Sequence, residues 1–376
     1  MRIAVNTQHL LINKQEGIGW FAHETLSRMV RNHPEHEFLF IFDRPWDKSF
    51  IYGPNVIPVK TKISSRHPFL WLWHYEVDIP LILKKYKPDL FFSPDGWMSL
   101  STKIPTVTVI HDINFIHRPL DLPYLVRKYC NYFFPRFARK AKRIVTVSEF
   151  SKSDIVQTLK INPDKIDIAY NGCNPIYSPL TAEIKNEIKH KFTGGCPYFI
   201  YVGSRIPRKN IGGLLSAFEL FKATDDKYFK LLFVGEPMWS SSYLSEKLNS
   251  MKFKNDVVFT GRLSTEALQM VLGSSEALAL VSFYEGFGIP LIEAMYCDVP
   301  VICSNITSIP EVAGDAALFV DPNSISEIAN AMKQIAIHPE LRKSLIIKGR
   351  KQRNKFSWDN TAKEVWDSIE KAIISA

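Results

Sequence analysis

Two kinds of hydrophobic pattern alternate along the first half of the chain. Short apolar runs rich in Val, Ile and Phe are separated by longer segments in which apolar residues recur with the period of a helix. This alternation is typical of parallel strands joined by crossover helices. We therefore expect a helix after each of the strands predicted at residues 3–5, 38–42, 90–92, 107–110 and 144–147.

The same pattern returns in the second half after an interruption. Residues 171–197 hold glycines and prolines among polar residues and are predicted to form a linker. Further strands are predicted at 198–202, 231–234, 257–259, 277–281, 299–302 and 318–320, and a last amphipathic helix at 360–373. The sequence thus predicts two doubly wound α/β domains, 1–175 and 176–355. We expect the C-terminal helix in 356–376 to pack back on the first domain.

Composition narrows the class of protein. With 376 residues, 46% of them apolar, the chain can bury two cores. It has no long apolar run, and the start of the chain lacks the apolar core of a signal peptide, so we expect a cytoplasmic protein. Its five cysteines are widely spread without a C-x-x-C pair, which argues against a disulfide framework or a zinc site.

The positive charge is concentrated in one half. Residues 1–175 contain 24 Lys and Arg against 16 Asp and Glu, whereas 176–376 contain 23 against 22. Aromatic residues lie among the cations at 66–75 and 127–143. An anionic membrane surface, nucleic acid or a phosphorylated substrate would fit this charge. The aromatic rings could equally belong to the core. No sequence motif of a nucleic-acid-binding module is present, so we expect no nucleic acid partner.

The segment from Glu285 to Glu293 carries two carboxylates directly after a predicted strand. Gly286, Phe287 and Gly288 lie between them, and Pro290 suits the first turn of a following helix. Glycines permit close backbone approach to a ligand, and a helix N-terminus attracts phosphate. Two carboxylates so spaced could bind different hydroxyl groups of one ligand, although a surface Glu and a helical Glu would give the same spacing.

Three cations follow the strand that opens the second domain. Arg205, Arg208 and Lys209 lie within five residues at a strand-to-helix turn, which suits a diphosphate but also an ordinary solvated turn. No P-loop sequence occurs. In the first domain, the Gly17-Ile18-Gly19 loop permits a tight backbone approach to a charged ligand, although such a pair is more often an ordinary turn. His111 ends a strand, where α/β proteins bind ligands, although a single His is usually structural.

Taken in order, these segments resemble the retaining glycosyltransferases of family 4. The resemblance covers nearly the whole chain and rests on Gly17-Ile18-Gly19, 108–112, 145–151, 171–172, 202–203 with 208–210, 259–261, 285–293 and 356–358. It implies the GT-B fold, two facing Rossmann-like domains with a cleft between them. It also implies transfer of a sugar from a nucleoside diphosphate sugar to an acceptor hydroxyl with the anomeric configuration kept.

The family also implies roles for single residues. Glu285 is expected to bind hydroxyls of the transferred sugar, Glu293 the ribose, and His111 the sugar near its 6-hydroxyl. Lys209 and either Arg205 or Arg208 would bind the diphosphate with the backbone of Gly19, and Arg262 would lie near the base. Neither a metal nor another cofactor is expected, since fixed cations and a helix dipole can stabilise the leaving diphosphate. Glu285 is expected to position and stabilise, without forming a covalent bond.

Three alternatives remain open at this point. The same architecture could serve a nucleotide-sugar 2-epimerase, a phosphorylase that needs pyridoxal phosphate, or a non-catalytic basic protein that binds membrane or RNA. The family-based expectation is a bacterial mannosyltransferase-like enzyme that uses GDP-mannose. Its expected acceptor is a glycan or a lipid-diphosphate-linked glycan of surface polysaccharide synthesis. Peripheral association with the inner face of the cytoplasmic membrane would fit the basic first domain.

Overall fold

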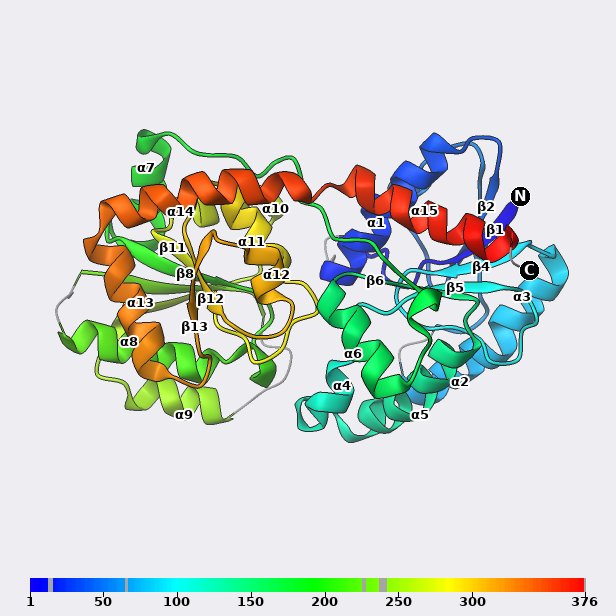
Figure 1. Cartoon of the computed structure of the whole chain (residues 1–376), viewed down its shortest axis with the longest axis horizontal. Helices are drawn as coiled ribbons and strands as arrows, with labels where there is room; N and C mark the ends of the chain where they lie inside the picture. Colours follow the sequence, from blue (N-terminus) through cyan, green and yellow to red (C-terminus); the bar gives the residue numbers. More distant parts are fainter. Residues whose placement is uncertain (13–15, 65–66, 225–227, 237–241, 375–376) are drawn as a thin grey trace. The chain divides into compact units, whose positions relative to one another are not determined.

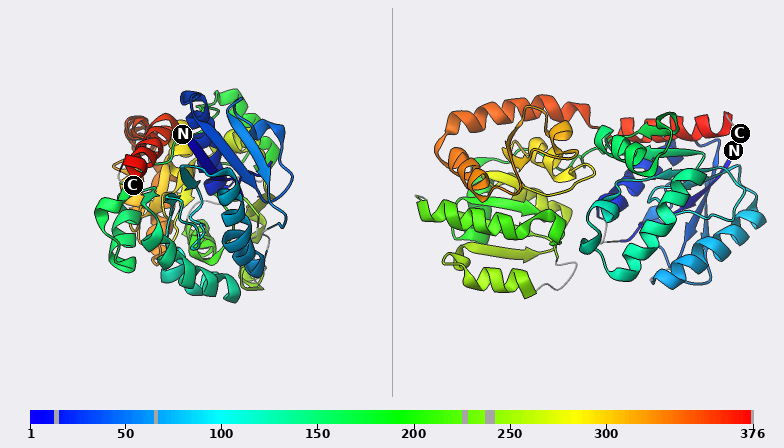
Figure 2. Two further views of the ribbon diagram at one scale, coloured as in Figure 1. Left: turned by 90° about the vertical axis from the view of Figure 1, so that its right-hand side faces the viewer. Right: turned by 60° about the horizontal axis from the view of Figure 1, so that its bottom comes forward.

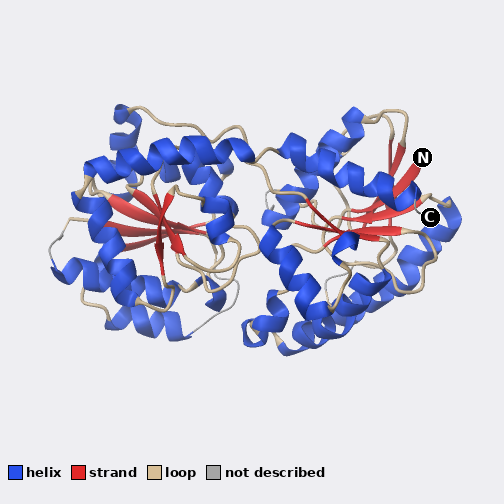
Figure 3. Cartoon of the chain, viewed as in Figure 1, coloured by secondary structure: helices blue, strands red, loops and turns tan. Residues whose placement is uncertain are grey.

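A computed structural model describes residues 1–12, 16–64, 67–224, 228–236 and 242–374. The chain divides into two compact units (Figure 1). The first comprises Met1–Gly172 together with Ser357–Ala376, and the second Cys173–Phe356. Each unit has a central sheet with helices on its faces, so both are α/β domains (Figure 3).

The first unit contains a seven-stranded parallel sheet in the order β3-β2-β1-β4-β5-β6-β7. Its strands are β1 (Arg2–Asn6), β2 (Glu37–Phe42), β3 (Val56–Lys60), β4 (Leu90–Ser93), β5 (Thr106–Val109), β6 (Arg143–Thr146) and β7 (Ile166–Ile168). Its helices are α1 (Gly17–Asn32), α2 (Pro68–Trp73), η2 (His74–Asp78), α3 (Ile79–Tyr86), α4 (Asn114–His117), α5 (Tyr124–Lys140), α6 (Glu149–Leu159) and α15 (Trp358–Ile374), with short turns η1 (Lys48–Phe50), η3 (Pro119–Asp121) and η4 (Pro163–Lys165).

The second unit contains a six-stranded parallel sheet in the order β10-β9-β8-β11-β12-β13. Its strands are β8 (Tyr198–Val202), β9 (Lys230–Val234), β10 (Val257–Gly261), β11 (Ala277–Leu280), β12 (Val301–Ser304) and β13 (Ala317–Val320). Its helices are α7 (Ala182–Thr193), α8 (Ile211–Thr224), α9 (Ser242–Ser250), α10 (Thr265–Gly273), α11 (Ile289–Tyr296), α12 (Ile309–Ala313), α13 (Ile325–Ile337) and α14 (Pro339–Gln352), with short turns η5 (Pro207–Lys209), η6 (Lys254–Asp256) and η7 (Arg353–Lys355).

The strand order of each sheet creates one topological switch point. In the first unit β1 lies beside β4, and in the second β8 lies beside β11. Successive strands run away from each of these pairs in opposite directions, so the connecting loops diverge at the carboxyl ends of the strands. Ligands of open α/β sheets bind at such switch points.

Helix α15 completes the first unit from the far end of the sequence. Figure 2 shows this helix, in red, running over the same unit as the blue N-terminal strands and α1. It packs on α1 with a buried face that includes Trp358, Val365 and Ile369. Backbone of residues 357–358 lies so close to Gly172 that a Cβ there would come within 2.3 Å of the Trp358 nitrogen.

Several predictions about local structure were wrong. The expected linker 171–197 contains α7, which begins after the N-cap Thr181 and ends at Gly194 in the left-handed region. The Gly17–Gly19 segment is the first turn of α1 rather than a loop. The connection from β4 to β5 lacks the expected α-helix, whereas α2 and α3 lie between β2 and β4 as expected, after the unpredicted strand β3.

Candidate active site

The carboxylate of Glu285 lies in the loop after β11 and is the centre of a buried ionic group. Its side chain is 6% exposed and pairs with Lys209 through Oε1 and with Arg208 through Oε2, the latter at 3.2 Å. Ser282 donates a hydrogen bond of 2.7 Å to Oε1. The loops after β8 and β11 therefore meet through this group at the switch point of the second sheet.

Charge decides the ionisation of Glu285. Burial alone would raise its pKa, but the nearby Lys209 and Arg208 cations outweigh burial and lower the pKa to about 2. Two charged hydrogen bonds to one buried carboxylate favour its ionised form. Glu285 is therefore an anion over the whole physiological pH range and cannot serve as a proton donor there.

The backbone around this group is tightly fixed. Arg208 donates a second hydrogen bond to the Tyr284 carbonyl, and its own carbonyl accepts from the Phe283 N–H, at 2.8 Å each. Asn210 has a left-handed φ of 57° and bonds the Val281 carbonyl at 3.0 Å. These contacts lock the turn η5 to the loop after β11, so the cations of this turn are held at the carboxyl end of the sheet.

Arg205 lies elsewhere, although it is only three residues from Arg208. Its guanidinium carbon is 4.7 Å from the centre of the Phe259 ring on β10, and its buried Nε has no hydrogen-bond partner among the residues that the structure describes. Its backbone N–H bonds the Glu236 carbonyl, and the Arg262 N–H bonds the Glu236 carboxylate at 3.1 Å. Arg205 and Arg262 thus belong to the β9–β10 side of the sheet, apart from the ionic group.

Helix α11 carries Glu293 and begins at Ile289. Gly288 is its N-cap with a left-handed φ of 96°, which favours glycine, and Pro290 lies in the first turn as expected. Phe287 is buried against Phe356, with ring centres 5.5 Å apart. Gly286 and the loop backbone are therefore held by packing of Phe287 on one side and by the start of α11 on the other.

Glu293 has the opposite electrostatics to Glu285. Its partner is the Tyr177 hydroxyl, which donates a hydrogen bond to the carboxylate. Burial raises the pKa of Glu293 to about 7, and the Tyr177 hydrogen bond opposes this shift. Tyr177 lies before α7 in the segment predicted as a linker, and sequence reasoning did not identify it.

The first unit contributes a separate polar group at the carboxyl ends of β4 and β5. His111 Nε2 lies 2.9 Å from the Pro94 carbonyl, and the ring packs edge-to-face on Phe21 of α1. Burial lowers the pKa of His111, so its imidazole is neutral. A carbonyl can only accept, so Nε2 carries the proton and Nδ1 is a hydrogen-bond acceptor. Gly19 is buried in the first turn of α1, two residues before Phe21.

Asp95 lies at the same edge of this sheet and was not identified from the sequence. Its carboxylate accepts hydrogen bonds from Asn6 Nδ2 at 2.9 Å and from Ser93 at 2.8 Å. His9 Nε2 lies 3.7 Å from its Oδ2, and the Asp95 side chain is 1% exposed. The switch point of the first sheet, between β1 and β4, thus holds a buried carboxylate beside a half-exposed imidazole.

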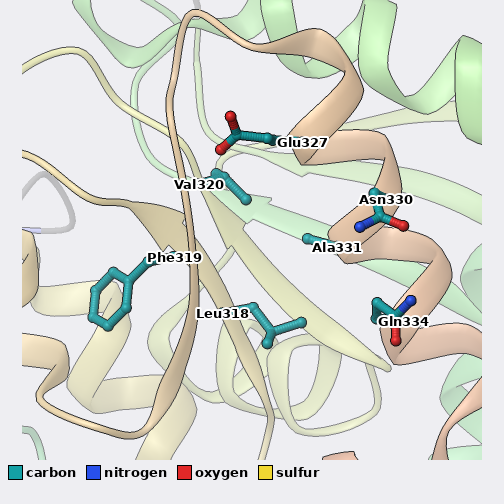
Figure 4. Close-up of a pocket in the computed structure, with 7 residues that line it drawn as sticks. All are labelled: Leu318, Phe319, Val320, Glu327, Asn330, Ala331 and Gln334. Atoms are coloured by element: carbon teal, nitrogen blue, oxygen red, sulfur yellow. The ribbon is translucent and has the colours of Figure 1, made fainter.

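A hollow of about 160 Å³ lies elsewhere in the second unit, between β13 and α13 (Figure 4). It is lined by Leu318, Phe319, Val320, Glu327, Asn330, Ala331 and Gln334, none of them a predicted site residue. Its volume is below that of ordinary small-molecule sites. The hollow shares no residue with the polar groups at the two switch points.

Comparison with known proteins identifies the family of this chain. The family described as "Glycosyl transferases group 1" matches residues 183–352, and "Glycosyltransferase Family 4" matches residues 16–176. O-antigen chain mannosyltransferase B of Escherichia coli is 32% identical over 279 residues, which cover 74% of this chain and 73% of that protein. O-antigen chain mannosyltransferase RfbU of Salmonella typhimurium is 28% identical over 290 residues, or 76% of each.

Solved structures share the fold at low sequence identity. The sucrose-phosphate synthase of Thermosynechococcus elongatus matches with a TM-score of 0.82 and 16% identity over 100% of both chains. HepE of Anabaena, in complex with UDP and glucose, matches with a TM-score of 0.75 and 15% identity over 98% of this chain and 99% of that one. The fold is therefore GT-B, and the chain belongs to glycosyltransferase family 4 and is a hexosyltransferase.

Proposed function

We propose that this glycosyltransferase moves mannose from GDP-mannose, with retention of configuration and without a metal, to a glycan or lipid-diphosphate-linked acceptor. The acceptor would belong to a bacterial surface polysaccharide. The single observation that carries the proposal is the ionic group of Glu285, Arg208 and Lys209 at the β8–β11 switch point. It combines a fixed anion for sugar hydroxyls with fixed cations for a diphosphate.

In this proposal Glu285 positions the sugar and does not attack it. Its negative charge is shared with two cations and a hydroxyl donor, which lowers its nucleophilicity. The same ion pairs hold the carboxylate in place, so it can accept hydrogen bonds from sugar hydroxyls without reorganising. The departing diphosphate would take the proton of the acceptor hydroxyl on the same face of the sugar, so no protein base is needed.

Arg208 and Lys209 are proposed to bind the diphosphate. They lie together on η5, whereas Arg205 packs on Phe259 at the other side of the sheet. These positions support Arg208, rather than Arg205, as the arginine that binds the diphosphate. The N–H of Arg262 is already bonded to Glu236, so a contact from Arg262 to the base would use its carbonyl or displace that bond.

His111 and Gly19 are proposed to complete the donor contacts from the first unit. Neutral His111 offers Nδ1 as an acceptor for a sugar hydroxyl, while the carbonyl of Pro94 fixes its tautomer. Gly19 lies in the first turn of α1, where backbone N–H groups have no acceptor within the helix and can bind phosphate.

The choice of donor rests on the relatives. Both enterobacterial relatives are described as O-antigen chain mannosyltransferases, whereas the HepE structure holds UDP and glucose. The higher sequence identity of the mannosyltransferases favours mannose, and with it GDP, as the donor for this chain.

We expect the purified protein to transfer mannose from GDP-mannose only when a glycan or lipid-diphosphate-linked acceptor is present. Radiolabelled sugar in the acceptor fraction measures the reaction, and UDP-glucose should give at most a small fraction of that rate. Formation of an epimerised nucleotide sugar without acceptor would instead identify a 2-epimerase and overturn the proposal.

Nucleotide binding provides the control for this assay. At a concentration of 100 times its dissociation constant, a cognate nucleotide stabilises the folded protein by about 2.7 kcal/mol. GDP should therefore raise the melting temperature more than UDP or ADP does. A shift with UDP alone would transfer the donor assignment to a UDP-sugar while leaving the transferase assignment intact.

We further propose that the first unit binds an anionic membrane surface through one face of α5. This face presents Tyr124, Lys128, Tyr132 and Arg136 at intervals of four residues, all exposed. The Arg136 guanidinium lies 3.5 Å from the centre of the Tyr132 ring. Exposed aromatic rings beside cations suit the headgroup region of a bilayer.

Only part of the two aromatic-basic segments is available for such a surface. Phe134 and Phe137 of α5 are buried in the core, and Lys140 bonds the Leu100 and Thr102 carbonyls. Arg66 of the earlier segment lies outside the described residues. Within the described residues, no helix is both long and apolar enough to cross a membrane, so contact would be peripheral.

Replacing Lys128, Arg136 and Arg139 with Gln should weaken sedimentation with anionic vesicles, because each cation near such a surface contributes about 1 kcal/mol. GDP binding should not change, since these residues and Lys209 belong to different units. A matched variant with Gln at Lys343, Lys348 and Lys351 of α14 removes the same charge from the second unit. Equal binding to neutral and anionic vesicles, or equal losses in both variants, would contradict this surface.

A further inference from the structure

A turn between α1 and β2 gathers metal-ligating side chains that the proposed transfer does not use. It comprises residues 33–36, with sequence His33-Pro34-Glu35-His36. The His36 N–H bonds the His33 carbonyl at 3.1 Å and closes the turn. Pro34 fixes φ at the second position, where proline is favoured in β-turns. The turn thus presents two imidazoles and a carboxylate from a stiff backbone.

The three ligating atoms lie close to the spacing that a metal would require. Glu35 Oε1 is 3.3 Å from His36 Nε2 and 3.7 Å from His33 Nδ1. All three atoms lie within 4.8 Å of one another. Around tetrahedral zinc, with bonds of about 2.0–2.2 Å, neighbouring ligand atoms are about 3.3–3.6 Å apart. Two of the three distances between ligand atoms, 3.3 and 3.7 Å, therefore agree within about 0.1 Å with the distances expected around zinc.

Helix α15 holds both imidazole rings from the other end of the chain. The Trp366 ring stacks on His33 with centres 3.5 Å apart and planes at 13°, and lies 5.3 Å from the His36 ring at 15°. The indole N–H donates to Glu370 at 2.8 Å, which fixes the Trp366 ring in turn. Ordered rings lose little side-chain entropy when they bind an ion.

The second nitrogen of His36 also has a partner. Nδ1 lies 3.1 Å from the terminal ammonium of Met1. An ammonium has no lone pair, so it donates to Nδ1 and orients the His36 ring with Nε2 toward Glu35. A metal that binds through Nε2 would displace the proton that the imidazole carries on that nitrogen.

From these contacts we propose that His33 Nδ1, the Glu35 carboxylate and His36 Nε2 bind one zinc ion, with water in the fourth position. Imidazole and carboxylate ligands suit Zn²⁺ and its late first-row neighbours better than Mg²⁺. The ion would stabilise the first unit where α1 ends against α15, independently of donor binding. An ion pair between Glu35 and protonated imidazoles is the alternative account of the same contacts.

Zinc titration of the untagged full-length chain by calorimetry separates the two accounts. We expect one equivalent to bind to the wild type in the micromolar range or tighter. His33→Ala with His36→Ala should abolish this equivalent, and Glu35→Gln should weaken it at least about tenfold, since it removes the anionic ligand. His117→Ala is the matched control, because it removes an imidazole paired with the Asp154 carboxylate outside the cluster.

A spectroscopic measurement guards against a variant that fails to fold. Cu²⁺ on His33 would lie beside the stacked Trp366 ring and should quench its fluorescence in the wild type, and to a lesser extent in Glu35→Gln. The thermal melting of the metal-free variants reports whether they are folded. Zinc binding of unchanged stoichiometry and affinity in the folded double variant, or no binding to the wild type, would overturn the proposal.

Discussion

Lys209→Ala is expected to lower the rate of the proposed mannose transfer by a factor on the order of 100 or more. Lys209 is one of two cations paired with Glu285 at the switch point, and we propose that it neutralises the departing diphosphate. Its loss would also leave the buried Glu285 carboxylate with Arg208 as its remaining ion-pair partner. Steady-state kinetics with GDP-mannose should show the loss mainly in kcat, because charge develops on the leaving group in the transition state.

Lys189→Ala is the matched control for this prediction. Lys189 also forms a partly buried ion pair in the second unit, with Glu276 at 2.6 Å, and its side chain is 18% exposed against 13% for Lys209. If the loss of activity came only from breaking a buried ion pair, Lys189→Ala would lose activity as Lys209→Ala does. Wild-type activity of Lys209→Ala, together with a large loss in Arg205→Ala, would move the diphosphate site to Arg205.

Donor affinity is expected to fall as the pH is lowered through 7, because we propose that Glu293 binds the ribose hydroxyls as a carboxylate, which accepts hydrogen bonds more strongly than the protonated acid. With a pKa of about 7, only about 3% of Glu293 is ionised at a pH 1.5 units lower, so GDP should bind roughly 30-fold more weakly than on the alkaline plateau. Calorimetric titrations with GDP across this range measure the effect. Glu293→Gln should remove the pH dependence and bind weakly throughout.

The stability of the nucleotide-free protein should change with pH in the opposite sense. The pKa of Glu293 is higher in the folded chain than its ordinary value of 4.5, so folding favours the protonated form. Its contribution to the free energy of unfolding is therefore favourable below about pH 4.5 and is lost as the pH rises to 7.

Tyr177→Phe should move the midpoint of GDP binding to higher pH, since the Tyr177 hydroxyl stabilises the Glu293 carboxylate. An unchanged midpoint would show that another group controls the titration.

The interior of both sheets could be predicted from the sequence. Strands buried on both faces form continuous apolar runs, and every strand predicted from such a run is present within two residues at each end. The strands missed, β3 and β7, are the edges of the first sheet. Pro58 lies in β3 and Asp167 in β7, and edge strands tolerate such residues because one side of the backbone is unpaired.

The site could be predicted only where its residues directly follow predicted strands. The rule that functional residues follow strands selected Lys209, Glu285 and His111, and the same rule applied to residues 93–96 after β4 would have selected Asp95. Tyr177 gave no comparable signal, because it follows no strand and meets Glu293 only through folding. The separation of Arg205 from Arg208 likewise depends on side-chain packing, which spacing along the chain does not encode.

The position of α15 has a consequence for the order of folding during synthesis. Residues 173–356, the whole second unit, leave the ribosome before the helix that covers α1 has been made. The first unit begins to be synthesised earlier yet is completed later. The apolar face of α1 therefore stays uncovered while the second unit folds. Nascent chains of this protein would therefore expose their main chaperone-binding surface in the N-terminal half, until the residues around Trp366 emerge.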